Sequence, residues 1–372
     1  MNVFPVEGCF LFRPREPLGD SRLIRPDWTV PRNRDPRLLW LDKNENCDPH
    51  MTQVVRRLWA SLDPVLATTY PDCGSLYRKL ARFSGVEPDQ LLLSTGADGC
   101  IRSVFETFIE PGDTVIHLEP TYTMYKIYCS IFGADTEVIN YVATSQGPEL
   151  SIDTIRSAVQ RSRPKLICLP NPASPTGTVI HLDQIRDLAE LASDCGSLLL
   201  VDEAYHPFHP VSVVPLVSTY PNVVVVRTFS KAWAVAGLRI GYAIADRAVS
   251  QLLHKVQPSY EVNHIAIGVA DLVMDEEVEM WESVKRLNNG RNHFVDKMHE
   301  FGLRTAPSAG NFLLVEFADQ SEAIHAALAD LALYRHDFGH PSLAGYSRFT
   351  ATTVELFEPI IERIRQVVTA AA

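Results

Sequence analysis

Short apolar runs alternate with amphipathic stretches from about residue 42 to residue 245 of the 372-residue chain. The runs are bounded by turn residues and are apolar on both faces, which is typical of strands covered by helices on both sides. They are Leu91–Leu93, Thr114–Leu118, Leu166–Leu169, Ser197–Val201, Val223–Val226 and Arg239–Ala245. Helical spacing of apolar residues appears between them at 76–83, 97–108 and 182–191. This alternation predicts a three-layer α/β fold with a mostly parallel, doubly wound sheet.

The pattern changes after about residue 275. A long polar, amphipathic helix is followed by a strand-like run at Asn311–Phe317, a helix at 321–333, and a terminal helix with one apolar face. We therefore expect a large domain at 42–275 and a smaller α+β domain at 276–372. Residues 1–41 are rich in proline and arginine and show no period. They are predicted to form an irregular N-terminal arm that belongs with the small domain.

Composition narrows the possible function classes. The chain is 46% hydrophobic and 21% charged, values that are ordinary for a globular protein. Its net charge of −11 disfavours binding to nucleic acid, because that affinity comes from Lys and Arg on phosphates. No apolar run is long enough to cross a membrane, and the first residues do not resemble a secretory signal. The seven cysteines are scattered without a CxxC pair, so we expect a cytoplasmic protein without structural metal.

Two segments at predicted strand ends have the composition of ligand-binding loops. Residues 94–98, Ser-Thr-Gly-Ala-Asp, join a strand to a helix, and free amides at a helix start favour an anion. Residues 171–177, Asn-Pro-Ala-Ser-Pro-Thr-Gly, form a constrained loop at a carboxyl strand end, where open α/β sheets bind ligands. Taken alone, the first segment is better explained as an ordinary turn. The second is explained equally well as a rigid turn without a ligand.

Two further segments place a charge beside a buried strand. Asp202 ends a strongly apolar run, and a buried carboxylate needs a partner such as a ligand cation or a pyridinium nitrogen. Taken alone, this segment is explained at least as well by an aspartate that caps a helix or meets an arginine. Lys231 follows Val223–Val226 closely, among small and hydroxyl residues. Desolvation would keep its amine neutral and nucleophilic, as Schiff-base chemistry requires. The alternative is a lysine whose amine reaches the surface.

Taken together and in this order, the four segments resemble the pyridoxal-phosphate-dependent aminotransferases of fold type I, the aspartate aminotransferase-like fold. The run Thr228–Gly237 looks like the class II attachment signature. Asp42–Asn46, Tyr70-Pro71-Asp72 and Pro120–Tyr125 resemble further segments of the family. The resemblance covers nearly the whole chain after about Leu41.

The resemblance implies catalytic roles for three residues. Lys231 would hold the cofactor, pyridoxal 5′-phosphate, and move the substrate proton. Asp202 would pair with the pyridine nitrogen, so that the ring withdraws electrons. Tyr205 would hydrogen-bond the ring oxygen. Ser174 stands where the family usually has an asparagine for that oxygen, which leaves the tuning of the ring open.

The remaining cofactor contacts are implied by the same resemblance. Tyr122 is expected to stack on the ring. Tyr70 is expected to reach the phosphate in the neighbouring subunit, which implies a homodimer with shared sites. Within one chain, the phosphate is expected to lie against Gly96, Ala97, Asp98, Thr228, Ser230 and Arg239.

The C-terminal segments look most like those of histidinol-phosphate aminotransferases. In Tyr346–Thr350, Arg348 is expected to bind the substrate's acidic group, and Arg335 would add a second positive charge suited to a phosphate. Arg335 is almost as well explained as a surface charge that pairs with a neighbouring Asp. Asn44 and Asn311 complete the expected substrate-binding residues.

The chain also departs from the family. Gly99 and Arg102 replace acidic residues, the usual glycine after the Arg348 strand is absent, and an arm containing Trp28 precedes the family's usual opening. We expect an aminotransferase that moves an amino group between an amino acid or amino-alkyl phosphate and a 2-oxo acid, with glutamate and 2-oxoglutarate as the second pair. The alternative is a decarboxylase of a phosphorylated amino acid, similar to threonine-phosphate decarboxylase, because the two chemistries share one scaffold.

Overall fold

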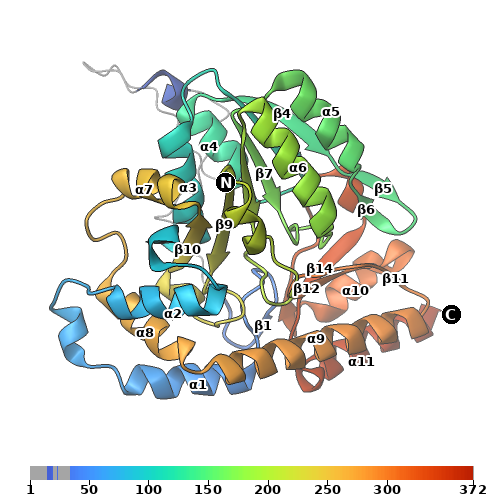
Figure 1. Cartoon of the computed structure of the whole chain (residues 1–372). Helices are drawn as coiled ribbons and strands as arrows, with labels where there is room; N and C mark the ends of the chain where they lie inside the picture. Colours follow the sequence, from blue (N-terminus) through green and yellow to red (C-terminus); the bar gives the residue numbers. More distant parts are fainter. Residues whose placement is uncertain (1–14, 20–22, 24–33, 372) are drawn as a thin grey trace, which may run out of the picture.

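The fold is seen in a computed structural model, which describes residues 15–19, 23 and 34–371. Most of the predicted arm at 1–41, with Trp28, lies outside the described residues. A seven-stranded sheet forms the centre of the molecule, in the order β2-β10-β9-β8-β7-β3-β4 (Figure 1). Its strands are β2 (Leu91–Ser94), β3 (Thr114–Glu119), β4 (Asp135–Asn140), β7 (Leu166–Pro170), β8 (Leu198–Asp202), β9 (Val223–Thr228) and β10 (Gly241–Ala245). Only β10 runs antiparallel to its neighbours in this sheet, so the predicted mostly parallel sheet is confirmed.

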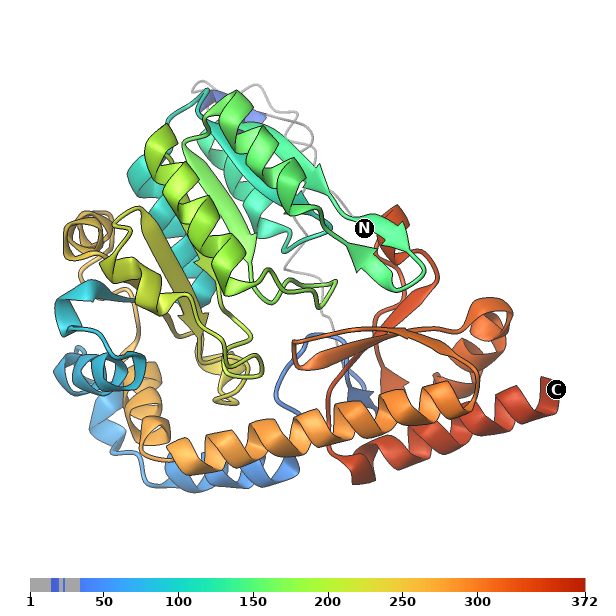
Figure 2. The ribbon, with the colours of Figure 1, turned by 45° about the vertical axis from the view of Figure 1, so that its right-hand side comes forward.

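Side chains alternate between two apolar layers along each central strand. In β8, Leu199 and Val201 face one layer, whereas Leu198 and Leu200 face the other. Figure 2 shows the sheet between the green helices α5 and α6 and the cyan helices behind it. The first layer contains α1 (Pro49–Ala60), α2 (Gly74–Ser84), α5 (Ile152–Ser162), α6 (Leu182–Cys195) and α8 (His264–Met274), and the second contains α3 (Gly96–Phe108), α4 (Met124–Phe132) and α7 (Arg247–Lys255).

Strand β4 has no counterpart among the predicted strands. Among the strands that the structure describes, it lies at the edge of the sheet and pairs with β3 alone. Most of its residues are exposed or half-buried, so the sequence Asp-Thr-Glu-Val-Ile-Asn contains no apolar run. Because this strand is largely exposed, it lacks the continuous apolar run that is typical of a strand buried on both faces.

The second unit of the structure follows α9 (Glu277–Glu300), which runs along the bottom of the molecule in Figure 1. A three-stranded antiparallel sheet of β11 (Arg304–Ala306), β12 (Phe312–Glu316) and β14 (Tyr346–Thr350) packs on α9, α10 (Ser321–Leu328) and α11 (Val354–Ala371). Its core contains Phe294, Phe317 and Phe357, all fully buried. The division of the chain at residue 275 stays a prediction.

The predicted helix at 321–333 is too long. Helix α10 ends at Leu328, and Ala332–Leu333 forms strand β13. This strand pairs in parallel with β1, Leu39–Trp40, from the opposite end of the chain. The apolar residues continue the helical spacing, but tertiary pairing with β1 takes them into a sheet.

A hairpin joins the large sheet to the C-terminal unit. It consists of β5 (Val142–Thr144) and β6 (Gly147–Glu149) and lies beside the C-terminal sheet in Figure 2. The guanidinium of Arg304 donates to the main-chain oxygen of Ser145 in its turn, at 3.3 Å. Short 3-10 turns occupy Glu16–Gly19, Pro64–Ala67, Pro88–Gln90, Val214–Ser218, Ala236–Leu238, Ala318–Gln320 and Pro341–Leu343. No helix in the described part of the chain is both long and apolar enough to cross a membrane.

Candidate active site

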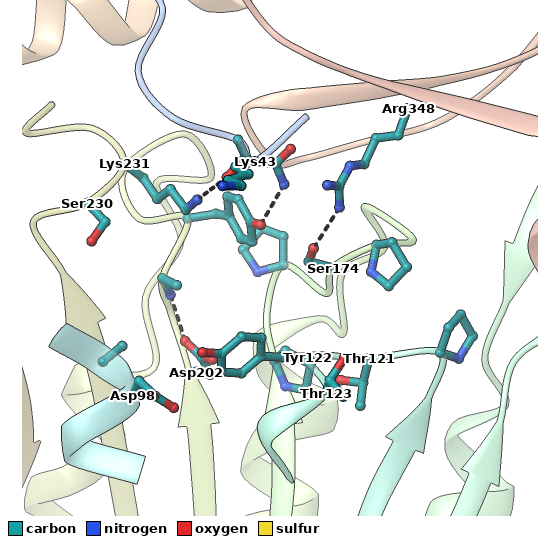
Figure 3. A pocket seen from close by; sticks show the side chains of 18 of the residues that line it. Lys43, Asp98, Thr121, Tyr122, Thr123, Ser174, Asp202, Ser230, Lys231 and Arg348 are labelled. Atoms are coloured by element: carbon teal, nitrogen blue, oxygen red, sulfur yellow. Dashed lines mark hydrogen bonds between the residues drawn. The ribbon is translucent and has the colours of Figure 1, made fainter. Parts of the chain in front are cut away.

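A cavity of about 590 Å³ lies at the carboxyl ends of β7, β8 and β9, beneath the C-terminal sheet. Ligands of open α/β sheets bind at this edge, because loops there leave a crevice above the strand ends. Figure 3 shows its side chains converging from different parts of the chain. Predicted site residues in its lining are Asn44, Ala97, Asp98, Tyr122, Ser174, Asp202, Tyr205, Thr228, Ser230, Lys231, Arg239, Arg335 and Arg348.

Lys231 lies in the loop after β9, and its amine points into the cavity rather than to open solvent. The Nζ atom donates to the main-chain oxygen of Lys43 at 2.8 Å, as the dashed line in Figure 3 marks. Burial lowers the pKa of this amine to about 7, and the positive charges of Arg348 and Arg239 act in the same direction, against the carboxylate of Glu45. A large fraction of the amine is therefore neutral near pH 7, the form that acts as nucleophile and base.

Asp202 ends β8 and is buried at the floor of the cavity. Its Oδ2 atom accepts from the Tyr125 hydroxyl at 2.9 Å, and Oδ1 accepts from the Ala204 amide at 3.0 Å. Burial raises the pKa of the carboxyl to about 6, while these two hydrogen bonds favour the ionised form. Since no described residue forms an ion pair with Asp202, its buried carboxylate suits a ligand that brings a protonated nitrogen.

Tyr125 is a site residue that the sequence interpretation did not assign. It is fully buried and lies on α4, whereas Tyr122 precedes that helix and lines the cavity. The two rings are perpendicular, with centroids 6.1 Å apart. The motif Pro120–Tyr125 was recognised as a unit. The spacing of the two tyrosines, which places both on one side of a helical turn, was the available signal.

A cup of hydrogen-bond donors forms where α3 begins. Gly96 has φ of 82°, and a Cβ atom there would lie 2.8 Å from Nη2 of Arg239. The guanidinium of Arg239 also donates to Oγ of Ser230 at 3.2 Å, and Thr228 donates to the same oxygen at 2.9 Å. The first amides of a helix have no partner within the helix, so the start of α3 adds donors and a partial positive charge. The cup therefore suits an anion, and the positive φ at position 96 favours glycine.

Arg348 lies on β14 and is buried. Its Nη2 atom donates to the main-chain oxygen of Asp42 at 2.8 Å, and Nη1 donates to Oγ of Ser174 at 3.4 Å. Its Nε atom is buried without a hydrogen-bond partner in the described part of the chain, and burial lowers the pKa of the guanidinium. No carboxylate of the described residues forms an ion pair with it. Ser174 thus contacts this arginine across the cavity.

Arg335 lies beside Arg348, because the two residues form an antiparallel β-bridge. Its guanidinium carbon lies 5.1 Å from the ring centre of Phe338, and that of Arg348 lies 5.9 Å from the same ring. The Nε atom of Arg335 donates to the main-chain oxygen of Asp337 at 3.2 Å, not to a neighbouring carboxylate. Two guanidinium groups therefore line one end of the cavity.

Asn44 connects the N-terminal segment to Tyr205. The asparagine has φ of 55°, a region that asparagine tolerates better than most residues, and its Nδ2 atom donates to the Tyr205 hydroxyl at 2.8 Å. Asn311 donates to the main-chain oxygen of Asn44 at 3.0 Å. Asn311 does not line the cavity and acts on it through Asn44.

Tyr70 lies away from this cavity. It is 76% exposed and stacks on Tyr260, with ring centroids 4.2 Å apart. Within one chain, the structure does not bring it to the other predicted site residues.

The surroundings of Gly99, which replaces an acidic residue of the family, contain a carboxylate from another segment. A Cβ atom at this position would overlap the hydroxyls of Ser94 and Thr95. Both hydroxyls donate to the carboxylate of Glu261, at 3.2 and 2.9 Å. A carboxylate from the segment before α8 is therefore present at this turn. Arg102, the other substitution, pairs with Glu106 on the surface of α3.

Known proteins resemble this chain over most of its length. Histidinol-phosphate aminotransferase 1 of Carboxydothermus hydrogenoformans is 31% identical over 329 residues, which cover 88% of this chain and 92% of the relative. A histidinol-phosphate aminotransferase of Dehalococcoides mccartyi is 30% identical over 350 residues, covering 93% and 94%.

The fold matches a solved structure of an enzyme with the same name. The crystal structure of histidinol-phosphate aminotransferase from Sinorhizobium meliloti in complex with pyridoxal-5′-phosphate has a TM-score of 0.76 at 22% identity, covering 90% of this chain and 91% of that one. The profile of the family "Aminotransferase class I and II" matches residues 36–364. The chain therefore belongs to the class I and II aminotransferase family and is a pyridoxal-phosphate-dependent aminotransferase.

Proposed function

We propose that the cavity holds pyridoxal 5′-phosphate through three groups of residues. The donor cup around Gly96, Ser230 and Arg239 fits its phosphate, Asp202 fits its ring nitrogen, and Lys231 fits its aldehyde carbon. The fit is supported by a cup that a Cβ atom at position 96 would enter, and by a buried carboxylate without a positive partner among the described residues. When bound, the cofactor supplies a carbonyl group for the substrate's amine and a ring that withdraws electrons from its Cα.

The chain's own residues then perform the proton chemistry. Lys231 Nζ, about half neutral near pH 7, would take the proton from the substrate Cα and deliver it to the aldehyde carbon of the cofactor. Asp202 keeps a proton on the facing ring nitrogen, because its negative charge is buried and is oriented by Tyr125 and Ala204. Tyr205, held by Asn44, offers its hydroxyl toward the cavity. Tyr122 closes the cavity on the side of α4.

We propose that the substrates are an amino-alkyl phosphate similar to histidinol phosphate and the glutamate/2-oxoglutarate pair. One observation supports this proposal: Arg348 is a buried cation without an ion-pair partner among the described residues, and Arg335 lies beside it in the cavity lining. A buried charge needs a counter-charge, and a doubly negative phosphate or a dicarboxylate supplies it. The two relatives described above are named for the same phosphate ester. Both are named as aminotransferases, so decarboxylation is not favoured.

A half-reaction tests this substrate assignment. The purified enzyme, loaded with cofactor, is mixed with histidinol phosphate and separately with a panel of amino acids, without an acceptor. Histidinol phosphate and glutamate should each bleach the visible absorbance of the cofactor, and 2-oxoglutarate should restore it. Arg335→Gln should slow the reaction with the phosphate ester more than the reaction with a monocarboxylic amino acid. Release of carbon dioxide without bleaching would instead establish the decarboxylase chemistry.

We also propose a homodimer in which Tyr70 reaches the neighbouring active site. The proposal is supported by the exposed Tyr70–Tyr260 stack outside this chain's own cavity. Mixing inactive Lys231→Ala subunits with weakly active Tyr70→Ala subunits should restore activity, because one site of each hybrid dimer then carries both wild-type side chains. The proposal is contradicted if the activity of the mixture equals the sum of the activities of the two separate variants, or if the protein is a monomer in solution.

We propose a cytoplasmic location. All six cysteines in the described residues are free, and Cys100, Cys129 and Cys168 are buried. Free thiols persist in a reducing compartment. Labelling with a thiol reagent directly after lysis, under denaturing conditions, should modify every cysteine.

A further inference from the structure

We infer that Arg34 is a positioning residue for this active site: it clamps the strap Asp42–Glu45, whose consecutive residues hold the side chains of Arg348, Lys231 and Tyr205. The inference rests on the roles proposed above for these three side chains. Arg34 itself does not line the cavity.

Three consecutive residues of the strap each contact one functional side chain. The main-chain oxygen of Asp42 accepts from Arg348 at 2.8 Å, and that of Lys43 accepts from Lys231 at 2.8 Å. The next residue, Asn44, donates to Tyr205 at 2.8 Å. A small rotation of the strap would therefore move the partners of the acid-binding arginine, the lysine and the tyrosine together.

The strap is well anchored at its two flanks but not in its middle. Leu41 pairs with the C-terminal unit through Leu333 and Thr350, and the side chain of Thr350 also accepts from the Asn44 amide at 2.9 Å. Between them, the oxygens of Asp42 and Lys43 point to the cavity and accept only from Arg348 and Lys231 among the described residues. The conformation of this part of the strap therefore depends on what holds its side chains.

Arg34 holds the first and last side chains of the strap by forking between their two carboxylates. Its Nη2 atom donates to Asp42 and its Nη1 atom to Glu45, both at 2.7 Å, and no other described residue forms an ion pair with either acid. The guanidinium carbon lies 4.8 Å from the ring centre of Trp40, and the arginine side chain is only 15% exposed. A planar, half-buried fork fixes both ends of the strap more firmly than an exposed ion pair does.

The clamp also acts on the charge near the lysine. The carboxylate of Glu45 raises the pKa of Lys231 and so opposes the effects of burial and of Arg348. Because Arg34 holds Glu45 in place, it sets the position of an acid whose charge acts on the reacting amine. A residue outside the cavity can thus influence both substrate binding and the loading of the cofactor.

Arg34→Gln and Arg37→Gln form a matched pair for testing this inference. Arg37 lies on the same segment and pairs with Asp35, but it is 86% exposed and contacts no residue of the strap. Each variant is measured as holoenzyme, with rates expressed per bound cofactor, and after removal of the cofactor. The readouts are KM for glutamate, kcat, the rate at which pyridoxal 5′-phosphate reloads the stripped protein, and the melting temperature.

Arg34→Gln should raise KM for glutamate and slow reloading, each by roughly tenfold, the size expected when a charged hydrogen bond is lost. Arg37→Gln should match the wild type in both. Arg34→Lys keeps the charge but cannot fork between two acids, so it should recover only part of the loss. A purely structural role would lower the melting temperature and leave KM, kcat and the reloading rate unchanged.

Equal KM and reloading rates in Arg34→Gln and Arg37→Gln would overturn the inference. If Arg34→Gln does not fold, Glu45→Gln removes one arm of the clamp and allows the same comparison. The proposed function fails independently: turnover by Lys231→Ala would refute the role of the lysine whatever Arg34 does.

Discussion

The amine of Lys231 should titrate near pH 7 in the protein freed of its cofactor. Burial lowers its pKa from 10.5 to about 7, with a further contribution from the charges of Arg348 and Arg239. At pH 7 about half of this amine is then neutral, whereas roughly one in three thousand ordinary lysines is. The neutral fraction of this amine at pH 7 should therefore exceed that of a free lysine by a factor on the order of a thousand.

Competitive acetylation measures this property directly. The stripped protein and a reference amine, Nα-acetyl-lysine, are treated with trace acetic anhydride between pH 5 and pH 11, and the peptide containing Lys231 is quantified by mass spectrometry. The ratio of the two labels, corrected for the reference, gives the midpoint of the Lys231 amine independently of its accessibility. A midpoint near 10 would refute the reasoning, because the cavity would then not penalise the charge.

Two variants test whether neighbouring charges set the pKa of Lys231. Arg348→Gln removes a positive neighbour and should raise the pKa of Lys231, whereas Glu45→Gln removes a negative neighbour and should lower it. Shifts in the same direction for both variants would show that rearrangement of the cavity, not charge, sets the titration.

The same shift predicts how stability depends on pH. Between about pH 7 and pH 10.5 the unfolded chain holds a proton on this lysine that the folded protein does not, so this lysine makes stability rise with pH in that window. The stripped Lys231→Met variant should therefore exceed the wild type in melting temperature most below pH 7. The difference should shrink as the pH approaches 10.5.

Three further substitutions test other parts of the structure. Gly96→Ala places a Cβ atom 2.8 Å from Nη2 of Arg239 in a left-handed backbone, and should weaken cofactor affinity roughly tenfold or more in an equilibrium titration. Glu203→Gln leaves the buried guanidinium of Arg227 without its counter-charge and should lower the free energy of unfolding by about 3–5 kcal/mol in denaturant melts. Arg348→Gln should lower kcat/KM for acidic substrates, measured with glutamate. The loss should correspond to about 1.5–3 kcal/mol of transition-state stabilisation.

For each of these substitutions, one outcome would contradict the prediction. An unchanged dissociation constant in Gly96→Ala would show that the cup does not hold the cofactor. The exposed pair of Arg57 and Glu276 is the control for Glu203→Gln, and Arg57→Gln should cost less than about 1 kcal/mol. Equal losses of unfolding free energy in the two variants would show that burial does not make the Glu203–Arg227 pair more costly to break. A normal kcat/KM in Arg348→Gln would move the acid-binding site elsewhere.

The local pattern of apolar residues was sufficient to predict most strands of the large sheet. The runs at Leu91–Leu93, Leu166–Leu169 and Val223–Val226 all lie within observed strands, because a strand covered on both faces must be apolar throughout. The repeat at 76–83 ends where Gly85 adopts φ of 69° and closes α2. The errors came where a distant segment decided the outcome, as when β1 drew Ala332–Leu333 into a sheet.

The predicted site residues were found through motifs whose chemistry is local. A glycine at a helix start, a carboxylate at a strand end and a lysine in a loop of small residues are all readable along the chain, and the structure brings the carboxylate, the lysine and the residues that follow the glycine to one cavity. The spacing of Tyr122 and Tyr125 marks a pair of tyrosines, but nothing along the sequence shows that the Tyr125 hydroxyl on α4 reaches Asp202 at the end of β8.

The sequence alone determined the family, the strands at the centre of the sheet and the residue types of the active site, because each depends on neighbours along the chain. Only the tertiary structure decided which charges remain without partners, which oxygens face Lys231 and Arg348, and that Arg34 clamps the strap beside them. The physical reason is that pKa values, burial and hydrogen bonds depend on atoms brought together across hundreds of residues. No periodicity or motif records those distances.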